Sequence, residues 1–200
     1  MKTNKLFGAF TFYTMLLAAT GGMIACNNKQ EPATEDTSKV AAEENDVKFD
    51  NKKQENDAQF LVDATAFNLE EIKLGYVVQQ RSNNANVKAL AKMMVTEHEK
   101  GLKELRDMAK TKQVTIPDSV NTDGAEAYAT LTAQTGDAFN KAYCESLLKS
   151  HEKIIASYEK IAADSRDQDI KEWATTKLPD LRKHVDHIFE CQKKLGVKVQ

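Results

Sequence analysis

The sequence lacks several of the features on which common protein functions depend. Its 28 basic residues do not outnumber its 30 acidic ones and form no basic stripe. This excludes nucleic acid as a partner, because phosphate neutralisation supplies most of that affinity. Only 8 glycines are present, and none belongs to a glycine-rich phosphate loop. Without such a loop or an arrangement of a nucleophile and a base, a hydrolase or an oxidase is disfavoured, and we first expect a non-enzymatic protein.

Long apolar runs are also missing, apart from one near the N-terminus. Residues 6–19 are predominantly apolar, but a membrane-spanning helix needs about 20 such residues. Lys2 and Lys5 precede this run, and the segment GGMIAC at 21–26 follows it. A positive start, a short apolar stretch and small residues before the cleavage point are typical of a secretory signal peptide. The final cysteine makes the segment resemble a bacterial lipobox.

We therefore predict a signal peptide over residues 1–25 and a lipid anchor on Cys26, which makes a membrane of the bacterial cell envelope the one partner indicated. The segment that follows, up to residue 56, is almost entirely polar, with Phe49 as its only aromatic residue. It cannot bury enough apolar surface to offset the entropy lost on ordering. We expect residues 26–56 to form a disordered tether with a reach of about 30 Å. The domain at 57–200 would then lie in the periplasm or outside the cell.

From residue 57 onward the apolar residues recur with the period of an α-helix, and no convincing strand alternation appears. The pattern predicts four long helices and, before the third of them, a short one, at 57–80, 85–112, 124–133, 137–163 and 168–195. Short polar turns join the first two and the last two long helices, so each pair should form an antiparallel hairpin. We therefore expect an all-α fold, an up-down-up-down four-helix bundle with a short extra helix before the third long helix.

Four polar side chains lie in the middle of the apolar seams of these helices. They are Glu71, His98, His151 and His184. Lys177 also lies on a seam, but its long stem lets the amine reach solvent. At a rise of 1.5 Å per residue, the heights of the four residues differ by about 5–7 Å within each hairpin. The pattern is therefore compatible with one shared site at the centre of the bundle.

Two interpretations of this cluster stay open. Three histidines and one carboxylate form a complete first shell for tetrahedral zinc and also suit copper or iron, so the cluster could bind a transition metal. In the same kind of envelope protein the cluster could instead act as a latch that responds to pH. Alternatively, the chain is a structural or interaction lipoprotein with an inert core, in which a Glu–His hydrogen-bond cluster only fixes the packing of the helices. In either case the buried carboxyl group of Glu71 has to pair, accept a hydrogen bond or take up a proton.

Residues 58–188 resemble the bacterial envelope family known as domain of unknown function 4142. The matching segments are EIKLG at 71–75, the stretch from Val87 to His98, Gly136 with 139–143, HEK at 151–153 and LPDLRKH at 178–184. The resemblance implies a ferritin-like four-helix fold in the cell envelope, and it implies no reaction. Asn140 stands where this family usually has an aspartate.

The sequence disfavours the di-iron centre that a ferritin-like fold suggests. Such centres use Glu-x-x-His on two helices, whereas Val95 and Leu181 occupy the positions three before His98 and His184. Cys144 and Cys191 are expected at similar heights on adjacent helices, and they could form a disulfide in an oxidising compartment.

Overall fold

The computed structural model describes residues 36–197, and within this range the chain forms helices and no strand. The helices are α1 (Thr37–Lys48), α2 (Lys52–Arg81), α3 (Ala85–Lys112), α4 (Thr122–Thr132), α5 (Gly136–Asp164) and α6 (Gln168–Lys194). None of them is both long and apolar enough to cross a membrane. The predicted signal peptide, Cys26 and the first part of the predicted tether lie outside the described residues.

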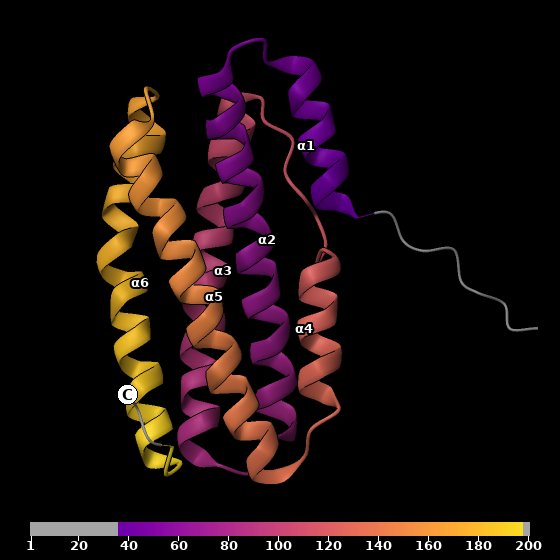
Figure 1. Cartoon of the computed structure of the whole chain (residues 1–200), viewed down its shortest axis with the longest axis vertical. Helices are drawn as coiled ribbons and strands as arrows, with labels where there is room; N and C mark the ends of the chain where they lie inside the picture. The colour runs from indigo at the N-terminus through magenta and orange to yellow at the C-terminus, as the bar shows by residue number, and fades with distance from the viewer. Residues whose placement is uncertain (1–35, 198–200) are drawn as a thin grey trace, which may run out of the picture. The chain divides into compact units, whose positions relative to one another are not determined.

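The four long helices form a bundle, so the predicted all-α fold is confirmed (Figure 1). In this bundle α2 packs against α3 and α5 against α6, while α2 also contacts α5 and α3 contacts α6. The ends of α2, α3, α5 and α6 agree with the predicted helices within five residues. The short helix predicted before the third long helix is α4, which lies against α2 and α5.

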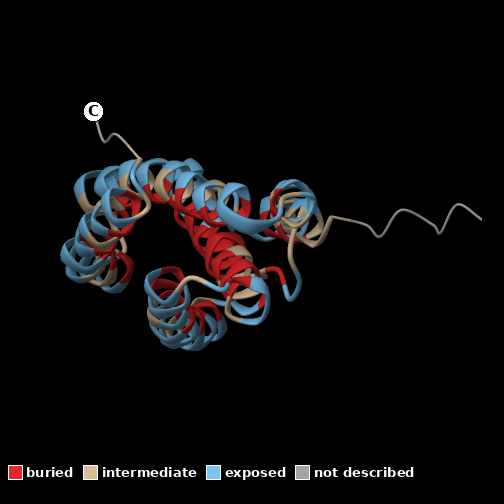
Figure 2. Cartoon of the chain, turned by 90° about the horizontal axis from the view of Figure 1, so that it is seen from below, coloured by how far each residue is buried: buried red, intermediate tan, exposed pale blue. Residues whose placement is uncertain are grey.

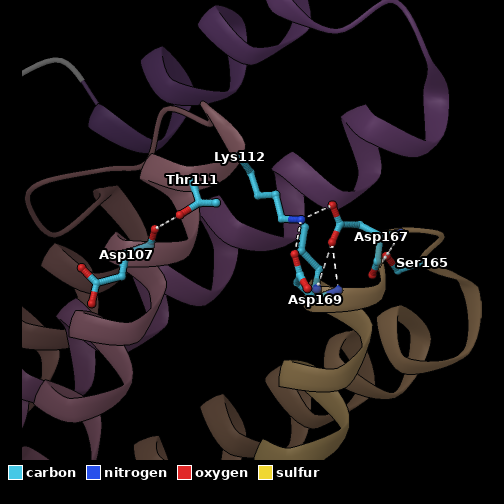
Figure 3. A network of polar contacts seen from close by, with 7 residues as sticks. Asp107, Thr111, Lys112, Ser165, Asp167 and Asp169 are labelled. Atoms are coloured by element: carbon cyan, nitrogen blue, oxygen red, sulfur yellow. Dashed lines mark hydrogen bonds and ion pairs between the residues drawn. The ribbon is translucent and has the colours of Figure 1, made fainter.

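The directions of the helices differ from the predicted alternation. Ser82, after the end of α2, donates a hydrogen bond of 2.7 Å to Asn140 near the start of α5. Lys112, the last residue of α3, pairs at 2.6 Å with both Asp167 and Asp169 at the start of α6 (Figure 3). The helices α3 and α5 therefore run parallel, because residues 113–135, which include α4, carry the chain back along the bundle (Figure 1). One long crossover of this kind is the connection of ferritin-like bundles.

The interior consists of two apolar clusters with a polar layer between them, formed by the buried residues Glu71, His98, His151 and His184. The first apolar cluster, called the Leu147 cluster, fills the end where α2 meets α3 and includes Leu74, Val78, Met94, Cys144, Leu147 and Cys191. The second, called the Tyr158 cluster, fills the end where α5 meets α6 and includes Phe60, Phe67, Leu105, Tyr158, Ile161 and Ile170. On α2 the Tyr158 cluster ends at Phe67 and the Leu147 cluster begins at Leu74. The buried faces of the helices point into this interior (Figure 2). The polar layer lies halfway along every helix of the bundle.

Helix α1 contradicts the prediction of a disordered tether. Asp36 caps α1 by accepting a bond of 3.0 Å from the amide of Ser38, and its second oxygen accepts bonds from Thr122. Asn45 is buried and forms two hydrogen bonds with the backbone of Thr115, at 2.7 and 2.8 Å. The prediction is therefore wrong for residues 37–56, where α1 and the start of α2 lie. Amino-acid composition alone does not predict order in such a segment. Helix capping and hydrogen bonds to a distant stretch of backbone stabilise it although it buries little apolar surface.

Candidate metal centre

Three of the four predicted site residues meet at the centre of the bundle. His98 on α3, His151 on α5 and His184 on α6 all belong to the polar layer, and their exposed fractions are 3%, 0% and 6%. Each comes from the apolar seam of its helix, so the helix packing that buries the seams also brings the three rings together. These three residues are called the histidine cluster below.

The histidine cluster is a nearly equilateral triangle. The ring centroids lie 5.5 Å apart for His98 and His151, 5.2 Å for His98 and His184, and 5.3 Å for His151 and His184. One nitrogen of each ring lies within 4.8 Å of those of the other two. Phe67 of α2 covers the cluster on one side, with its ring centroid 5.0 Å from that of His98 and 5.2 Å from that of His151.

Hydrogen bonds determine which nitrogen of His98 carries the proton. The Asn68 amide nitrogen donates to the carbonyl of Ala64 at 2.6 Å, which leaves the Asn68 oxygen as the acceptor that faces His98. This oxygen lies 3.1 Å from His98 Nδ1, so Nδ1 is the protonated nitrogen. His98 Nε2 therefore carries a lone pair, and it is buried without any hydrogen-bond partner in the structure.

The same reasoning applies to His151. Its Nδ1 lies 2.8 Å from the carbonyl oxygen of Leu147, one turn earlier on α5, and must donate to it. His151 Nε2 thus keeps a lone pair and accepts a bond of 3.2 Å from Nδ1 of His184. Asn68 and the Leu147 carbonyl thus fix the tautomers of two imidazoles so that each carries its lone pair on Nε2, as the outer-shell partners of metal-bound histidines do.

Burial keeps all three imidazoles neutral. It lowers the pKa of His98 well below its usual value, and the neighbouring histidines lower it further. The pKa of His151 falls to about 3, through burial and the proximity of His184. Burial also lowers the pKa of His184 to about 4. Near neutral pH the cluster therefore presents uncharged imidazoles, the form of histidine that binds metal ions.

Glu71, the fourth predicted site residue, lies at the other edge of His151. One oxygen of its carboxyl group is 3.9 Å from His151 Nδ1 and accepts a bond of 2.6 Å from the Ser150 hydroxyl. The second oxygen is buried without a partner. Burial raises the pKa of Glu71 to about 8, although the bond from Ser150 opposes this, so the carboxyl group is protonated at neutral pH. The structure thus brings the three histidines together and places Glu71 behind one of them.

A narrow cleft connects the histidine cluster with the surface. Its volume is about 40 Å³, which is room for more than one water molecule, and His98 and His184 form part of its wall. The exposed residues Glu97 and Lys100 stand at its edge. Asn68, whose side chain orients His98, also lines the cleft.

Several contributors to the site were not found from the sequence. Asn68 and Ser150 are ordinary polar residues beside the seams, and a backbone carbonyl carries no sequence signal. Gly101 gives a clearer signal, since a Cβ atom there would lie 2.9 Å from the Asn68 oxygen. A small residue one turn from a seam histidine indicates that a neighbouring side chain approaches closely.

The remaining residues singled out from the sequence lie elsewhere. Lys177 reaches the surface and pairs with Glu104 at 2.6 Å, as its long stem predicted. Cys144 and Cys191 are both buried and free. Among the described residues, no carboxylate joins the three histidines in a group of potential metal ligands.

Comparison with known proteins gives one match. The family model described as "Domain of unknown function (DUF4142)" matches residues 42–190, a range that extends from within α1 almost to the end of α6. It includes the whole histidine cluster and Glu71. No curated protein and no solved structure matches the chain.

Proposed function

Because this chain belongs to the DUF4142 family, whose description names no activity, we propose its function from the site itself: it is an envelope lipoprotein that binds a transition-metal ion through His98, His151 and His184. The observation that carries this proposal is the convergence of three neutral imidazoles in a buried layer. The anchor on Cys26 and the location in the cell envelope rest on the sequence pattern of residues 1–26.

The distances within the histidine cluster support metal binding. Zinc–nitrogen bonds of about 2.0–2.1 Å in tetrahedral geometry hold neighbouring donor atoms roughly 3.4 Å apart. His151 Nε2 and His184 Nδ1 are already 3.2 Å apart, and His184 Nδ1 becomes a ligand once its proton moves to Nε2 of the same ring. The widest separation, up to 4.8 Å, closes if the side chains rotate inward by roughly 1 Å. His98 Nε2, which has no partner, would gain one.

The donor set restricts the ion. Imidazole nitrogens suit zinc, copper, iron and nickel, whereas magnesium and calcium prefer oxygen ligands. Among these, we propose zinc, copper or iron. Three protein ligands leave a coordination position open, as in catalytic zinc sites. The cleft beside His98 and His184 supports access of a water molecule or a small ligand to that position.

A metal titration with matched histidine variants tests this proposal. The full chain, freed of metal with a chelator, is titrated with Zn²⁺ by calorimetry and with Co²⁺ by visible absorbance. We expect one ion per chain, and loss of this binding in His98→Ala, His151→Ala and His184→Ala. The fourth histidine, His187, is a matched control because its side chain is 36% exposed and lies outside the cluster. His187→Ala should bind the ion as the unchanged chain does.

Thermal unfolding separates a lost ligand from a lost fold. An ion that binds only the folded chain stabilises it, by about 2.7 kcal/mol at one hundred times the dissociation constant. We expect added Zn²⁺ to raise the Tm of the unchanged chain and of His187→Ala, and to leave that of the folded cluster variants unchanged. Absence of stoichiometric binding to the unchanged chain, or binding that survives in all three cluster variants, would exclude the proposed site.

The anchor needs a separate experiment. Cells that express the chain are fed labelled palmitate, and the protein is recovered from their membranes. We expect the label on the unchanged chain and neither label nor membrane attachment on Cys26→Ser. Equal labelling of both proteins would refute lipidation at Cys26 without bearing on the metal site.

A structural role for the polar layer is the second candidate function, and one observation favours it. The bond between His151 and His184 already joins α5 to α6 without an ion, and the bond of His98 to Asn68 joins α3 to α2. In this case the chain is a structural or interaction lipoprotein. The cluster variants would then lose stability although the unchanged chain binds no ion in the titration.

A further inference from the structure

The two cysteines of the described chain lie together in the Leu147 cluster, away from the histidine cluster. Cys144 belongs to α5 and Cys191 to α6, and both are free thiols. Across the interface between these helices, the two thiols are near enough for each to shift the pKa of the other. The pair thus matches the sequence expectation of two cysteines at similar height on adjacent helices. Cys191 lies just beyond the range that matches the family.

The proximity of the two thiols makes them unequal. The neighbouring Cys191 and burial raise the pKa of Cys144, which therefore stays protonated. The neighbouring Cys144 lowers the pKa of Cys191, the nearby charge of Lys194 lowers it further, and burial opposes both effects. Cys191 is thus the sulfur that ionises first, and the thiolate is the reactive form of cysteine.

Access to solvent distinguishes the two thiols in the same way. Cys191 lines a cleft of about 200 Å³ between α3 and α6, together with Met93 and His187. Cys144 is completely buried, with an exposed fraction of 0%, and does not line this cleft. A small reagent therefore meets Cys191 first, and Cys144 stands behind it.

We infer that Cys144 and Cys191 form a reactive thiol pair that hydrogen peroxide oxidises to a disulfide between α5 and α6, with Cys191 as the attacking thiol and Cys144 as the resolving thiol. The Cys191 thiolate attacks one peroxide oxygen, the O–O bond breaks, and Cys191 sulfenic acid and hydroxide form. The sulfur of Cys144 then attacks the sulfur of Cys191. The S–S bond forms, the S–O bond of the sulfenic acid breaks, and its hydroxyl group leaves as water with the proton of the Cys144 thiol. One peroxide is reduced to two waters, counting the proton taken up by the hydroxide, and two thiols become one disulfide.

The packing of the helices favours the bond. A disulfide needs its sulfurs about 2.05 Å apart, so the two free thiols have to approach each other. Both side chains belong to helices that already pack along their length. The bond would close the segment between residues 144 and 191, which includes the turn between α5 and α6. It should therefore raise the Tm of the oxidised chain.

The test treats the folded full chain with hydrogen peroxide in the presence of a chelator, so that no bound metal ion takes part. A digest without reductant is then analysed by mass spectrometry. We expect one cross-linked peptide that joins Cys144 to Cys191, a rise in Tm, and reversal of both by dithiothreitol. Peptide mapping distinguishes this product from any reaction of Cys26. Absence of the cross-link after peroxide has oxidised free cysteine in the same solution overturns the inference.

Single variants test the order of the two steps. In Cys144→Ser, dimedone should trap a sulfenic acid on Cys191, because the resolving thiol is missing. In Cys191→Ser, the enclosed Cys144 should stay unlabelled for as long as the chain is folded. Faster labelling of Cys144 than of Cys191 would overturn the proposed roles. Alanine variants, with circular dichroism as a check of folding, replace the serine variants where a buried hydroxyl disturbs the core.

Discussion

Replacing Glu71 with glutamine should remove a pH dependence from the stability of the protein. Glu71 is completely buried, and its pKa of about 8 lies far above the ordinary value of 4.5. Glutamine has nearly the same shape and still offers an oxygen that can accept the bond from Ser150. Glutamine gains or loses no proton between pH 4.5 and pH 8. A comparison of the two proteins therefore isolates the titration of the Glu71 carboxyl group.

The size of the effect follows from the two pKa values. Between pH 4.5 and pH 8 the folded chain keeps a proton on Glu71 that the unfolded chain releases. Each pH unit in this range therefore lowers the unfolding free energy of the unchanged chain by about 1.4 kcal/mol. Below pH 4.5 both states hold the proton and the effect vanishes. The difference in stability between the two proteins below pH 4.5 is the reference. Compared with that reference, Glu71→Gln should gain about 3 kcal/mol over the unchanged chain near pH 7 and about 5 kcal/mol above pH 8.

The assay is urea unfolding of both metal-free proteins over a series of pH values, followed by circular dichroism. The difference between the two stability curves is the relevant quantity, because the histidines titrate in both proteins. Glu152→Gln, which removes an exposed carboxylate from α5, is the matched control for the loss of one carboxyl group. A constant difference for Glu71→Gln would refute the reasoning, since Glu71 would then be ionised in the folded core.

On the acid side, the histidine cluster should lower the stability of the metal-free chain by roughly 4 kcal/mol per pH unit well below pH 6.5, because the unfolded chain then binds three protons that the fold excludes. Acid unfolding followed by circular dichroism checks this, and stability retained down to about pH 4 would contradict it. Gly75→Ala should cost about 1–3 kcal/mol in urea unfolding, because its Cβ would lie 2.5 Å from a methyl group of Val95. Asn68→Ala should weaken Zn²⁺ binding about 10–100-fold in calorimetry, and unchanged affinity would show that it does not orient His98. Asn45→Ala should speed hydrogen exchange of α1 amides by removing both bonds to Thr115, and equal protection would contradict the role given to that contact.

The periodic pattern predicted most of the fold because burial follows helix period directly. The seams of α2, α3, α5 and α6 became the buried faces, and polar turns marked the ends of the helices. Helix α1 escaped prediction because its attachment depends on Asn45 and on a backbone segment 70 residues away. The sequence also did not predict that α3 and α5 run parallel, because the apolar pattern of a helix is the same whichever way the helix runs in the bundle.

The candidate site could be predicted only in part, for a related reason. A seam position shows that a side chain is buried, and it does not show which neighbouring helix it faces. His98, His151 and His184 face the common axis, whereas Glu71 faces Ser150 in the interface between α2 and α5. Rotating a helix about its axis by a fraction of a turn decides whether a side chain faces the bundle axis or one neighbouring helix. The spacing of residues in the sequence does not determine this rotation. The protonation states depend on these same contacts.

The unpartnered atoms of the polar layer bear on the choice between a metal site and a packing role. Glu71, His98, His151 and His184 are all held in their neutral forms, so the layer avoids the large cost of a buried charge. Even so, His98 Nε2 and one oxygen of Glu71 have no hydrogen-bond partner, and each such atom costs about 1–3 kcal/mol. Apolar side chains of similar volume would join the two core clusters without this cost. A layer that served packing alone would gain nothing from the lone pair on His98, whereas a metal ion bound by the histidine cluster would use it.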